Sequence, residues 1–338
     1  MSPITLRRVA ARPLIALGLI AMTSGLATST SAAIAAPAAH DHASRDHAQA
    51  IAGHAVPAGG EPADLAPDRV RDDRAGGCTA QLSQLKLPDL RMALVPNTTR
   101  DRIRILPPPS TPVEGEPPFA PGTQLLRFTT IVMNTGTGPF HVKGVAAPQP
   151  DQDGDKYMTT RQKLYTTSSV TSDLAQCHMH ATPARAQFRG DGHDHWHVER
   201  MQRFQLLSKH GDVLGLGYKT GFCYFDGLKK RPDLPGHPSF ARFPSSGCGW
   251  SLSNDTISMG LSVGWGDVYP WSIAHQWIDV TGLADGEYRL CVTVDPLGHY
   301  LERNRTNNQS YSDITIAGVG TSAPTVTTTA RAAAACSA

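Results

Sequence analysis

The chain has 338 residues, a length that allows either two domains or one large β domain. Glycine (31) and proline (26) are frequent, and charged residues make up only 18% of the chain against about 25% in average proteins, so the composition favours turns over long salt-bridged helices. The formal net charge of +2 provides no overall field to attract nucleic acid or an anionic membrane, which speaks against polyanion-binding functions.

Residues 1–36 have the pattern of a secretory signal peptide. Arg7, Arg8 and Arg12 precede an apolar run over 14–27, and small residues at Ala-x-Ala spacing follow it. The run is shorter than the about 20 residues that a membrane-spanning helix needs, and no other stretch is long and apolar enough. The sequence therefore predicts a secreted, extracellular protein without a membrane span.

Both ends of the remaining chain lack hydrophobic periodicity. Residues 37–77 are rich in Ala, His, Asp, Gly and Pro, which predicts a disordered leader. Residues 318–338 are rich in Thr and Ala, and we expect a disordered tail there as well. Between them, residues 78–317 are numerous enough to bury a substantial core as one domain.

This central region is dominated by strand patterns. Residues 125–133 are rich in β-branched and aromatic side chains and end at a Gly- and Pro-containing turn over 134–139. Apolar residues alternate over 288–294, and short strands are predicted over 277–280 and 312–316. No stretch of 12 or more residues is convincingly helical, so we predict an all-β protein, a β-sandwich with long loops.

The cysteine pattern fits an exported protein. Six cysteines allow 15 complete pairings, and the sequence does not choose among them. None has the Cys-x-x-Cys spacing of a thiolate zinc site. We favour a bridge between Cys223 and Cys248, because it would close one polar loop and contribute roughly 2 to 4 kcal/mol. The six are Cys78, Cys177, Cys223, Cys248, Cys291 and Cys336.

Three histidines occupy alternate positions: His193, His195 and His197. In a strand, such residues point to the same face, so the three imidazoles would converge. Neutral imidazole binds copper, zinc, iron and nickel, and the spacing alone does not distinguish copper from zinc. An exposed histidine-rich strand is the alternative, but the apolar residues over 204–207 favour a metal site inside the folded region.

Two later segments, taken together with these histidines, resemble the lysyl oxidase family. Gly-Tyr-Lys-Thr-Gly-Phe-Cys over 217–223 is similar to the family segment in which a lysine precedes a Phe-Cys pair. The segment 260–269, which ends at Tyr269, and the Gln-Trp-Ile-Asp sequence over 276–279 are similar to the family's tyrosine segment and the strand after it. The histidine triplet matches the family's copper motif. The resemblance extends from about 87 to 316 and suggests a bacterial secreted member.

The resemblance implies a copper amine oxidase with a self-generated cofactor. In the family, a lysine and a tyrosine become lysine tyrosylquinone, and by motif match these residues are Lys219 and Tyr269, with copper on the three histidines. The activity implied is oxidative deamination of primary amines, either peptidyl lysine or small alkylamines, to aldehydes by O2, with release of ammonia and hydrogen peroxide. Tyrosine chemistry agrees, because an amine oxidase without a diffusible cofactor must build a redox-active group from its own side chains. The general base stays unassigned, with Asp279 and His275 both unproven.

The resemblance also implies a calcium site formed by the two ends of the central region. The motif segments 88–90 and 301–308 offer oxygen ligands that suit a hard cation. Asn304 stands where the family usually has an aspartate, which would reduce affinity, and a polar turn that closes the sandwich is the alternative. The implied ligands are Asp89, the Leu90 carbonyl, Glu302, Asn304, Asn307 and Asn308.

Two other functions compete with the oxidase. The segment 286–296 also resembles Ig-like adhesion modules, in which the histidines would hold a structural metal and Lys219 would stay unmodified. A zinc hydrolase would need a metal-activated water and a base such as Glu199. We favour the oxidase, because its three motifs occur in the family's order.

Overall fold

The computed structural model describes residues 77–93, 103–111, 113, 116–151, 154–189 and 194–336. The predicted signal peptide, all but the last residue of the predicted leader, and His193 lie outside the described residues. Within these ranges the elements are strands and three short 3-10 helices, Leu82–Gln84, Leu174–Gln176 and Ser245–Cys248, which confirms the all-β prediction. None of these helices has the length and hydropathy that a membrane span requires.

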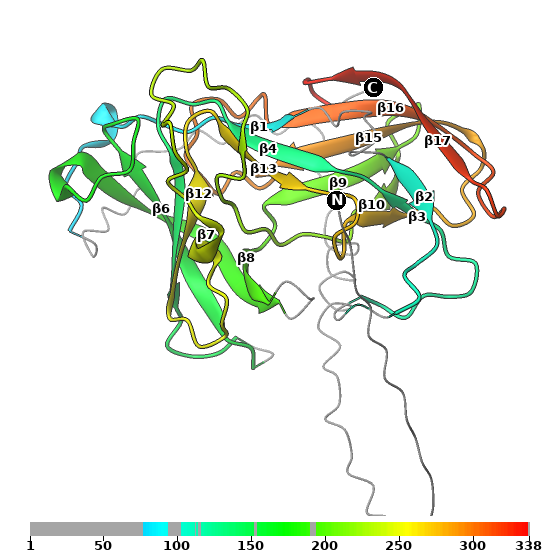
Figure 1. Ribbon diagram of the computed structural model, residues 1–338, viewed down its shortest axis with the longest axis horizontal. Coiled ribbons are helices and arrows are strands. Elements are labelled where there is room, and N and C mark those ends of the chain that lie inside the picture. Colours follow the sequence, from blue (N-terminus) through cyan, green and yellow to red (C-terminus); the bar gives the residue numbers. More distant parts are fainter. Residues whose placement is uncertain are drawn as a thin grey trace, which may run out of the picture. The chain divides into compact units, whose positions relative to one another are not determined.

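Two antiparallel sheets form one half of the fold (Figure 1). The four-stranded sheet has the order β1-β4-β13-β11, and the five-stranded sheet has the order β10-β9-β15-β16-β17. The first comprises β1 (Leu90–Ala93), β4 (Thr130–Asn134), β13 (Trp265–Tyr269) and β11 (Leu228–Lys229). The second comprises β10 (Val213–Leu216), β9 (Gln202–Leu207), β15 (Gly286–Val294), β16 (Gln309–Ala317) and β17 (Thr325–Ala332).

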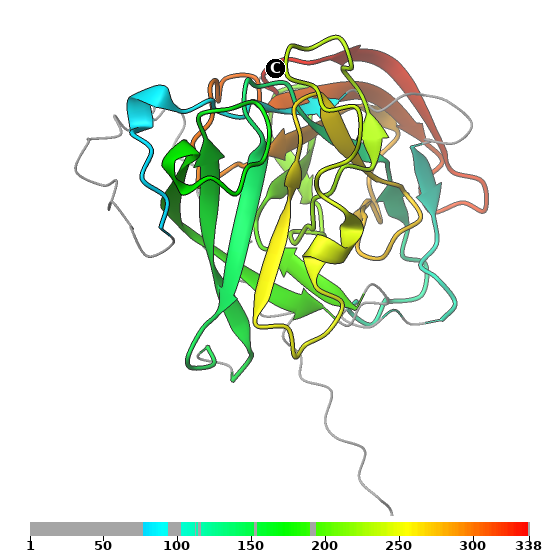
Figure 2. The ribbon, with the colours of Figure 1, turned by 60° about the vertical axis from the view of Figure 1, so that its left-hand side comes forward.

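A second five-stranded sheet, with the order β12-β5-β6-β7-β8, carries the histidine strand at its edge (Figure 2). A small sheet with the order β14-β3-β2 completes the fold. The larger sheet comprises β12 (Thr256–Leu261), β5 (Phe140–Ala146), β6 (Tyr157–Tyr165), β7 (Cys177–Arg189) and β8 (His195–Val198). The smaller comprises β14 (Trp277–Asp279), β3 (Leu125–Arg127) and β2 (Arg104–Leu106).

One continuous core joins the sheets, as expected for a sandwich. Leu90, Val132, Phe204, Val292 and Ile314 are buried in the same cluster, although they come from five strands of two sheets. In β16 buried and half-buried residues alternate along the whole strand, which is the period of a sheet with one face on the core. The same cluster includes Phe222 and Tyr269, so the candidate site is part of the core.

The predicted strand over 125–133 divides into β3 and β4, which belong to different sheets. Nearly all residues of this stretch are buried, including the polar residues Arg127, Thr129 and Thr130, so no exposed residue marks the point where the chain changes sheet. The strands predicted over 277–280, 288–294 and 312–316 appear as β14, β15 and β16.

The disordered tail predicted over 318–338 is wrong for the part of it that the structure describes. Thr325–Ala332 forms β17, which pairs with β16 in antiparallel register. Cys336 then bonds to Cys291 in β15. This segment shows no hydrophobic period because β17 lies at the sheet edge, where none of its residues is buried and backbone hydrogen bonds to β16 hold it in place.

All six cysteines form disulfides. The favoured Cys223–Cys248 bridge is confirmed. The other two are Cys78–Cys177 and Cys291–Cys336, which join segments 99 and 45 residues apart.

Candidate active site

The histidine strand β8 pairs with β7, with His195 opposite Arg189 and His197 opposite Gln187. The rings of His195 and His197 lie 4.4 Å apart between centroids, as alternate residues on one face of a strand can. His197 is only 2% exposed. Two neighbouring imidazoles suit a transition-metal ion such as copper or zinc, and His193, the third predicted ligand, lies outside the described residues.

The Cys223–Cys248 disulfide lies beside this strand. Its sulfur atoms and a ring nitrogen of His195 are within 4.8 Å of one another. Because the two cysteines are joined to each other, they offer no thiolate to a metal, and the candidate ligands are imidazoles. The ring of Trp250 lies 4.9 Å from the His195 ring and is tilted by 54° relative to it.

The lysine segment 217–223 is fixed at both of its ends. The Tyr218 N–H donates to the Trp277 carbonyl at 3.0 Å. Phe222 and Val198 exchange two backbone hydrogen bonds of 3.0 and 2.9 Å. The segment that carries Lys219 is therefore paired directly with the end of the histidine strand.

Gly221 permits this close approach. A Cβ at this position would lie 3.0 Å from the His197 Cβ and 2.8 Å from Oε1 of Glu199. The Glu199 carboxylate itself forms an ion pair with Arg189 at 3.1 Å. Glycine leaves room for backbone where any larger residue would push the lysine segment away from the histidines.

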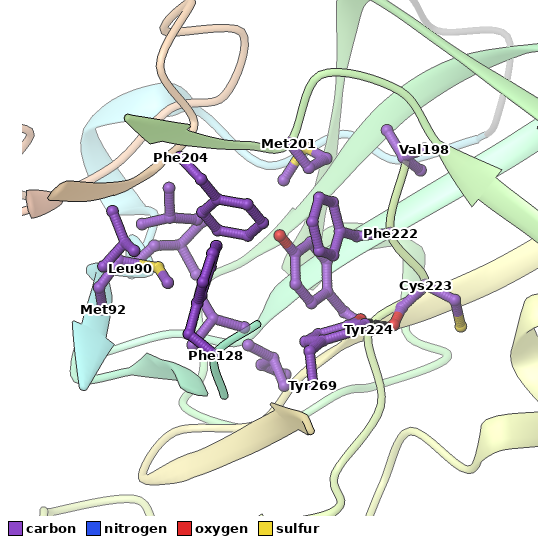
Figure 3. Close-up of a cluster of buried hydrophobic side chains, with 14 of the residues drawn as sticks. Leu90, Met92, Phe128, Val198, Met201, Phe204, Phe222, Cys223, Tyr224 and Tyr269 are labelled. Atoms are coloured by element: carbon purple, nitrogen blue, oxygen red, sulfur yellow. Dashed lines mark hydrogen bonds between the residues drawn. The ribbon is translucent and has the colours of Figure 1, made fainter. Parts of the chain in front are cut away.

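Tyr269, the last residue of β13, approaches the same segment from the other side (Figure 3). Its ring lies 4.9 Å from the Phe222 ring and is nearly perpendicular to it, at 84°. The Tyr269 hydroxyl donates to the Cys223 carbonyl. Nζ of Lys219 lies 5.4 Å from the centroid of the same Phe222 ring. The amine and the phenol, fifty positions apart in the chain, therefore share one aromatic neighbour.

Both side chains are shielded from solvent, with Lys219 4% exposed and Tyr269 8% exposed. Burial, together with the nearby Asp267, raises the pKa of the Tyr269 phenol well above its ordinary value. The pair thus occupies a low-dielectric interior position in which polar interactions are strong.

Asp267 is a site residue that the motif comparison missed. It precedes Tyr269 by two positions in β13, so both point to the same face. Its carboxyl group is 2% exposed, and burial raises its pKa to about 8. Strand alternation counted back from Tyr269 is the sequence signal that could have identified it. The earlier candidate Asp279 is exposed and accepts a hydrogen bond from the Thr281 N–H.

The residues of the implied calcium site come together where β1 meets the segment 301–308. The Leu90 N–H and the Asn308 amide donate to the two carboxylate oxygens of Glu302, at 2.6 and 2.9 Å. The Asn307 amide donates to Asp89 at 2.9 Å. Burial raises the pKa of Glu302 to about 8. A cation at this point would favour its charged form.

The fit to calcium is partial. The side-chain oxygens of Asn307 and Asn308 are buried and have no hydrogen-bond partner. Such oxygens are suitable ligands for a calcium ion. The side-chain oxygen of Asn304 instead accepts hydrogen bonds from the N–H and hydroxyl of Thr306, at 2.9 and 2.8 Å. Asn304 is therefore engaged in its own turn.

Fold and site together define a β-sandwich protein whose buried lysine and tyrosine lie beside a histidine strand. The sequence pattern of the lysyl oxidase family matches residues 142–324, more than half of the chain. The chain belongs to the lysyl oxidase family.

Individual relatives match over a shorter stretch. Lysyl oxidase homolog 2 of Xenopus tropicalis is 31% identical over 119 residues, which cover 35% of this chain and 14% of the relative. Lysyl oxidase homolog 2A of Danio rerio is 31% identical over 122 residues, which cover 34% of this chain and 14% of the relative. Lysyl oxidase homolog 3 of Homo sapiens is 28% identical over 117 residues, which likewise cover 34% of this chain and 14% of the relative. The match thus spans about a seventh of the length of these relatives.

Proposed function

We propose that this chain is a secreted, copper-dependent amine oxidase whose cofactor, lysine tyrosylquinone, forms from Lys219 and Tyr269. It converts primary amines, either peptidyl lysine or small alkylamines, to aldehydes, consumes O2, and releases ammonia and hydrogen peroxide. Copper is held by His193, His195 and His197. Family membership supports the amine oxidase class, and the disulfides and the signal-peptide pattern support secretion.

One observation carries the proposal. The Lys219 amine and the Tyr269 ring both contact Phe222, at 5.4 and 4.9 Å. Phe222 is itself hydrogen-bonded to Val198, the neighbour of His197. The three motifs, separate in the sequence, therefore converge on one residue, which is the arrangement that intramolecular bond formation needs.

The surrounding residues prepare this pair for reaction. Phe222 and Tyr224 keep water from the Tyr269 ring, and the Cys223 carbonyl fixes its hydroxyl. The buried Lys219 amine is stripped of hydration that would hinder nucleophilic attack. Copper, when bound, would supply the redox chemistry by which O2 oxidises the tyrosine ring to the quinone that the lysine amine joins.

The test is direct detection of the bond. The full chain is secreted with copper and digested, and mass spectrometry searches for a peptide that links Lys219 to Tyr269. We expect the linked peptide together with peroxide release from alkylamines. Unmodified peptides at both positions after full copper loading would overturn the proposal and favour a non-catalytic binding module.

Matched variants assign the roles. Lys219→Ala should abolish both the link and peroxide release, whereas Lys209→Ala, at an exposed lysine paired with Glu287, should preserve both. His195→Ala should prevent copper uptake and link formation. A linked peptide in His195→Ala would contradict its assignment as a ligand.

We also propose a calcium site of modest affinity at Asp89, Leu90, Glu302, Asn307 and Asn308, with Asn304 at its margin. The buried amide oxygens of Asn307 and Asn308 support it. Calcium titration followed by calorimetry tests it, with Glu302→Gln expected to remove the binding heat.

A further inference from the structure

Two buried aspartates, Asp226 and Asp267, interact electrostatically with each other, and they differ in how their oxygens are used. Oδ1 of Asp226 accepts the Ser262 N–H at 2.8 Å. Its Oδ2 accepts the Ser262 hydroxyl and the N–H groups of Arg242 and Phe243, at 2.7, 2.7 and 3.2 Å. Both carboxylate oxygens of Asp226 are thus used in hydrogen bonds that join loop segments, which explains why this aspartate is buried.

Asp267 is not used in that way. Oδ1 accepts the Val268 N–H at 2.8 Å, but Oδ2 is buried without a hydrogen-bond partner among the described residues. Burial of an unpaired carboxyl oxygen costs free energy. A purely structural role does not explain this loss of stability, because no hydrogen bond to Oδ2 offsets it. A catalytic role for Oδ2 explains why the unpaired oxygen is retained.

The free oxygen belongs to the neighbourhood of the proposed cofactor. Asp267 and Tyr269 share one face of β13, and each alters the pKa of the other. The other titratable groups that face Asp267 are Tyr224 and Asp226, both on the adjoining segment 224–226. Neither brings a positive charge, so the carboxyl group can hold a proton near neutral pH.

Amine oxidation by a quinone needs a base at this position. The C–H bond at the α-carbon of the amine must break, its electron pair must reduce the quinone, and its proton must go to an acceptor. We propose that Oδ2 of Asp267 is that acceptor, the general base of the amine oxidation. O2 then takes the two electrons together with two protons, one of which regenerates the Asp267 carboxylate as it leaves Oδ2, and is reduced to hydrogen peroxide. This inference rests on the proposed function.

The proton affinity of Asp267 suits the task. Desolvation raises its pKa to about 8, although the Val268 N–H, which donates to Oδ1, opposes the rise. A base with a pKa near the working pH both accepts a proton readily and is partly ionised. The rate of amine oxidation should therefore rise with pH up to about 8, as the carboxyl group loses its proton.

The test compares two variants of the full chain loaded with copper, Asp267→Asn and Asp279→Asn. Asp279 is the control position because it is an exposed aspartate, at the end of β14. Three quantities are measured for each: the Lys219–Tyr269 peptide, the coloured adduct with phenylhydrazine, and benzylamine turnover. Phenylhydrazine reports the quinone carbonyl and has no α-hydrogen to lose. We expect Asp267→Asn to keep the peptide and the adduct but to lose turnover by about 10²- to 10⁴-fold, whereas Asp279→Asn keeps all three.

A kinetic isotope effect separates catalysis from structure. With α-deuterated benzylamine, residual turnover by Asp267→Asn should show a larger isotope effect than the wild type, because proton removal becomes rate-limiting. Turnover within about threefold of wild type would overturn the assignment. Loss of the linked peptide in Asp267→Asn alone would also overturn it and place the carboxyl group in cofactor formation. Absence of the peptide in the wild type would instead defeat the proposed function itself.

Discussion

Phe222 is the residue on which the candidate site depends, because its ring lies against both the Lys219 amine and the Tyr269 ring. We predict that Phe222→Ala lowers the free energy of unfolding by about 3 to 5 kcal/mol and sharply reduces the linked peptide. Phe222→Leu keeps most of the volume and should cost less, about 1.5 kcal/mol. Urea unfolding and quantitative mass spectrometry check both variants. Full linkage in Phe222→Ala would contradict the positioning role.

Gly221 sets the distance between the lysine segment and the histidine strand. Gly221→Ala places a methyl group 3.0 Å from the His197 Cβ, so we predict a loss of about 1 to 3 kcal/mol of stability and weaker copper binding. Gly286→Ala is the control, because its nearest neighbour would be a tolerable 3.6 Å away. Copper titration and thermal unfolding measure the two effects. Equal behaviour of the two variants would refute the steric argument.

Asp267 makes stability depend on pH. In the unfolded chain its carboxyl group ionises near 3.8, whereas in the folded protein it stays protonated until about pH 8. The folded state therefore binds the extra proton between these values, and stability falls as pH rises from about 4 to about 8. We predict that Asp267→Asn removes the contribution of this carboxyl group to the fall in the free energy of unfolding, on the order of a few kcal/mol. Unfolding of copper-free protein at several pH values tests it, and an unchanged slope would contradict the prediction.

At the scale of elements, the sequence patterns located β14, β15 and β16 but not the division between β3 and β4. A strand that faces the core on one side shows its period in the sequence, as β16 does. A stretch that is buried throughout shows none, and its sheet assignment depends on partners elsewhere in the chain.

The edge strand β17 gives an element-scale prediction. Truncation after residue 324 removes its pairing with β16 and the Cys291–Cys336 bridge, which spans 45 residues. We expect a loss of roughly 4 kcal/mol from the disulfide alone, and more from the exposed edge. The double variant Cys291→Ser with Cys336→Ser keeps the strand and should lose only the stability that the disulfide contributes. Denaturant unfolding compares them, and an unchanged midpoint in the truncated chain would show that the tail is dispensable.

At the scale of the whole molecule, copper should couple the site to global stability. An ion that binds only the folded state, at a concentration of 100 times its dissociation constant, adds about 2.7 kcal/mol. We predict that copper raises the melting temperature of the metal-free chain and that His195→Ala abolishes the rise. His210→Ala, at an exposed histidine, should keep it. Calorimetry with and without a chelator measures the shift, and an equal shift in both variants would point to binding elsewhere.

The sequence by itself determined the strand-rich class and the family and singled out the motif residues of the candidate site, because these are matters of local pattern and motif. Alternation along β8 was enough to predict that His195 and His197 share a face. Motif similarity was enough to single out Lys219 and Tyr269. Loop polarity was enough to favour the Cys223–Cys248 pair.

Only the tertiary structure decided that Phe222 lies against both Lys219 and Tyr269, that Asp267 keeps an unpaired buried oxygen, and that residues 325–332 complete a sheet. Each of these depends on contacts between segments far apart in the chain. A residue's own neighbours in sequence carry no record of such contacts, since burial and desolvation arise only when distant strands pack together.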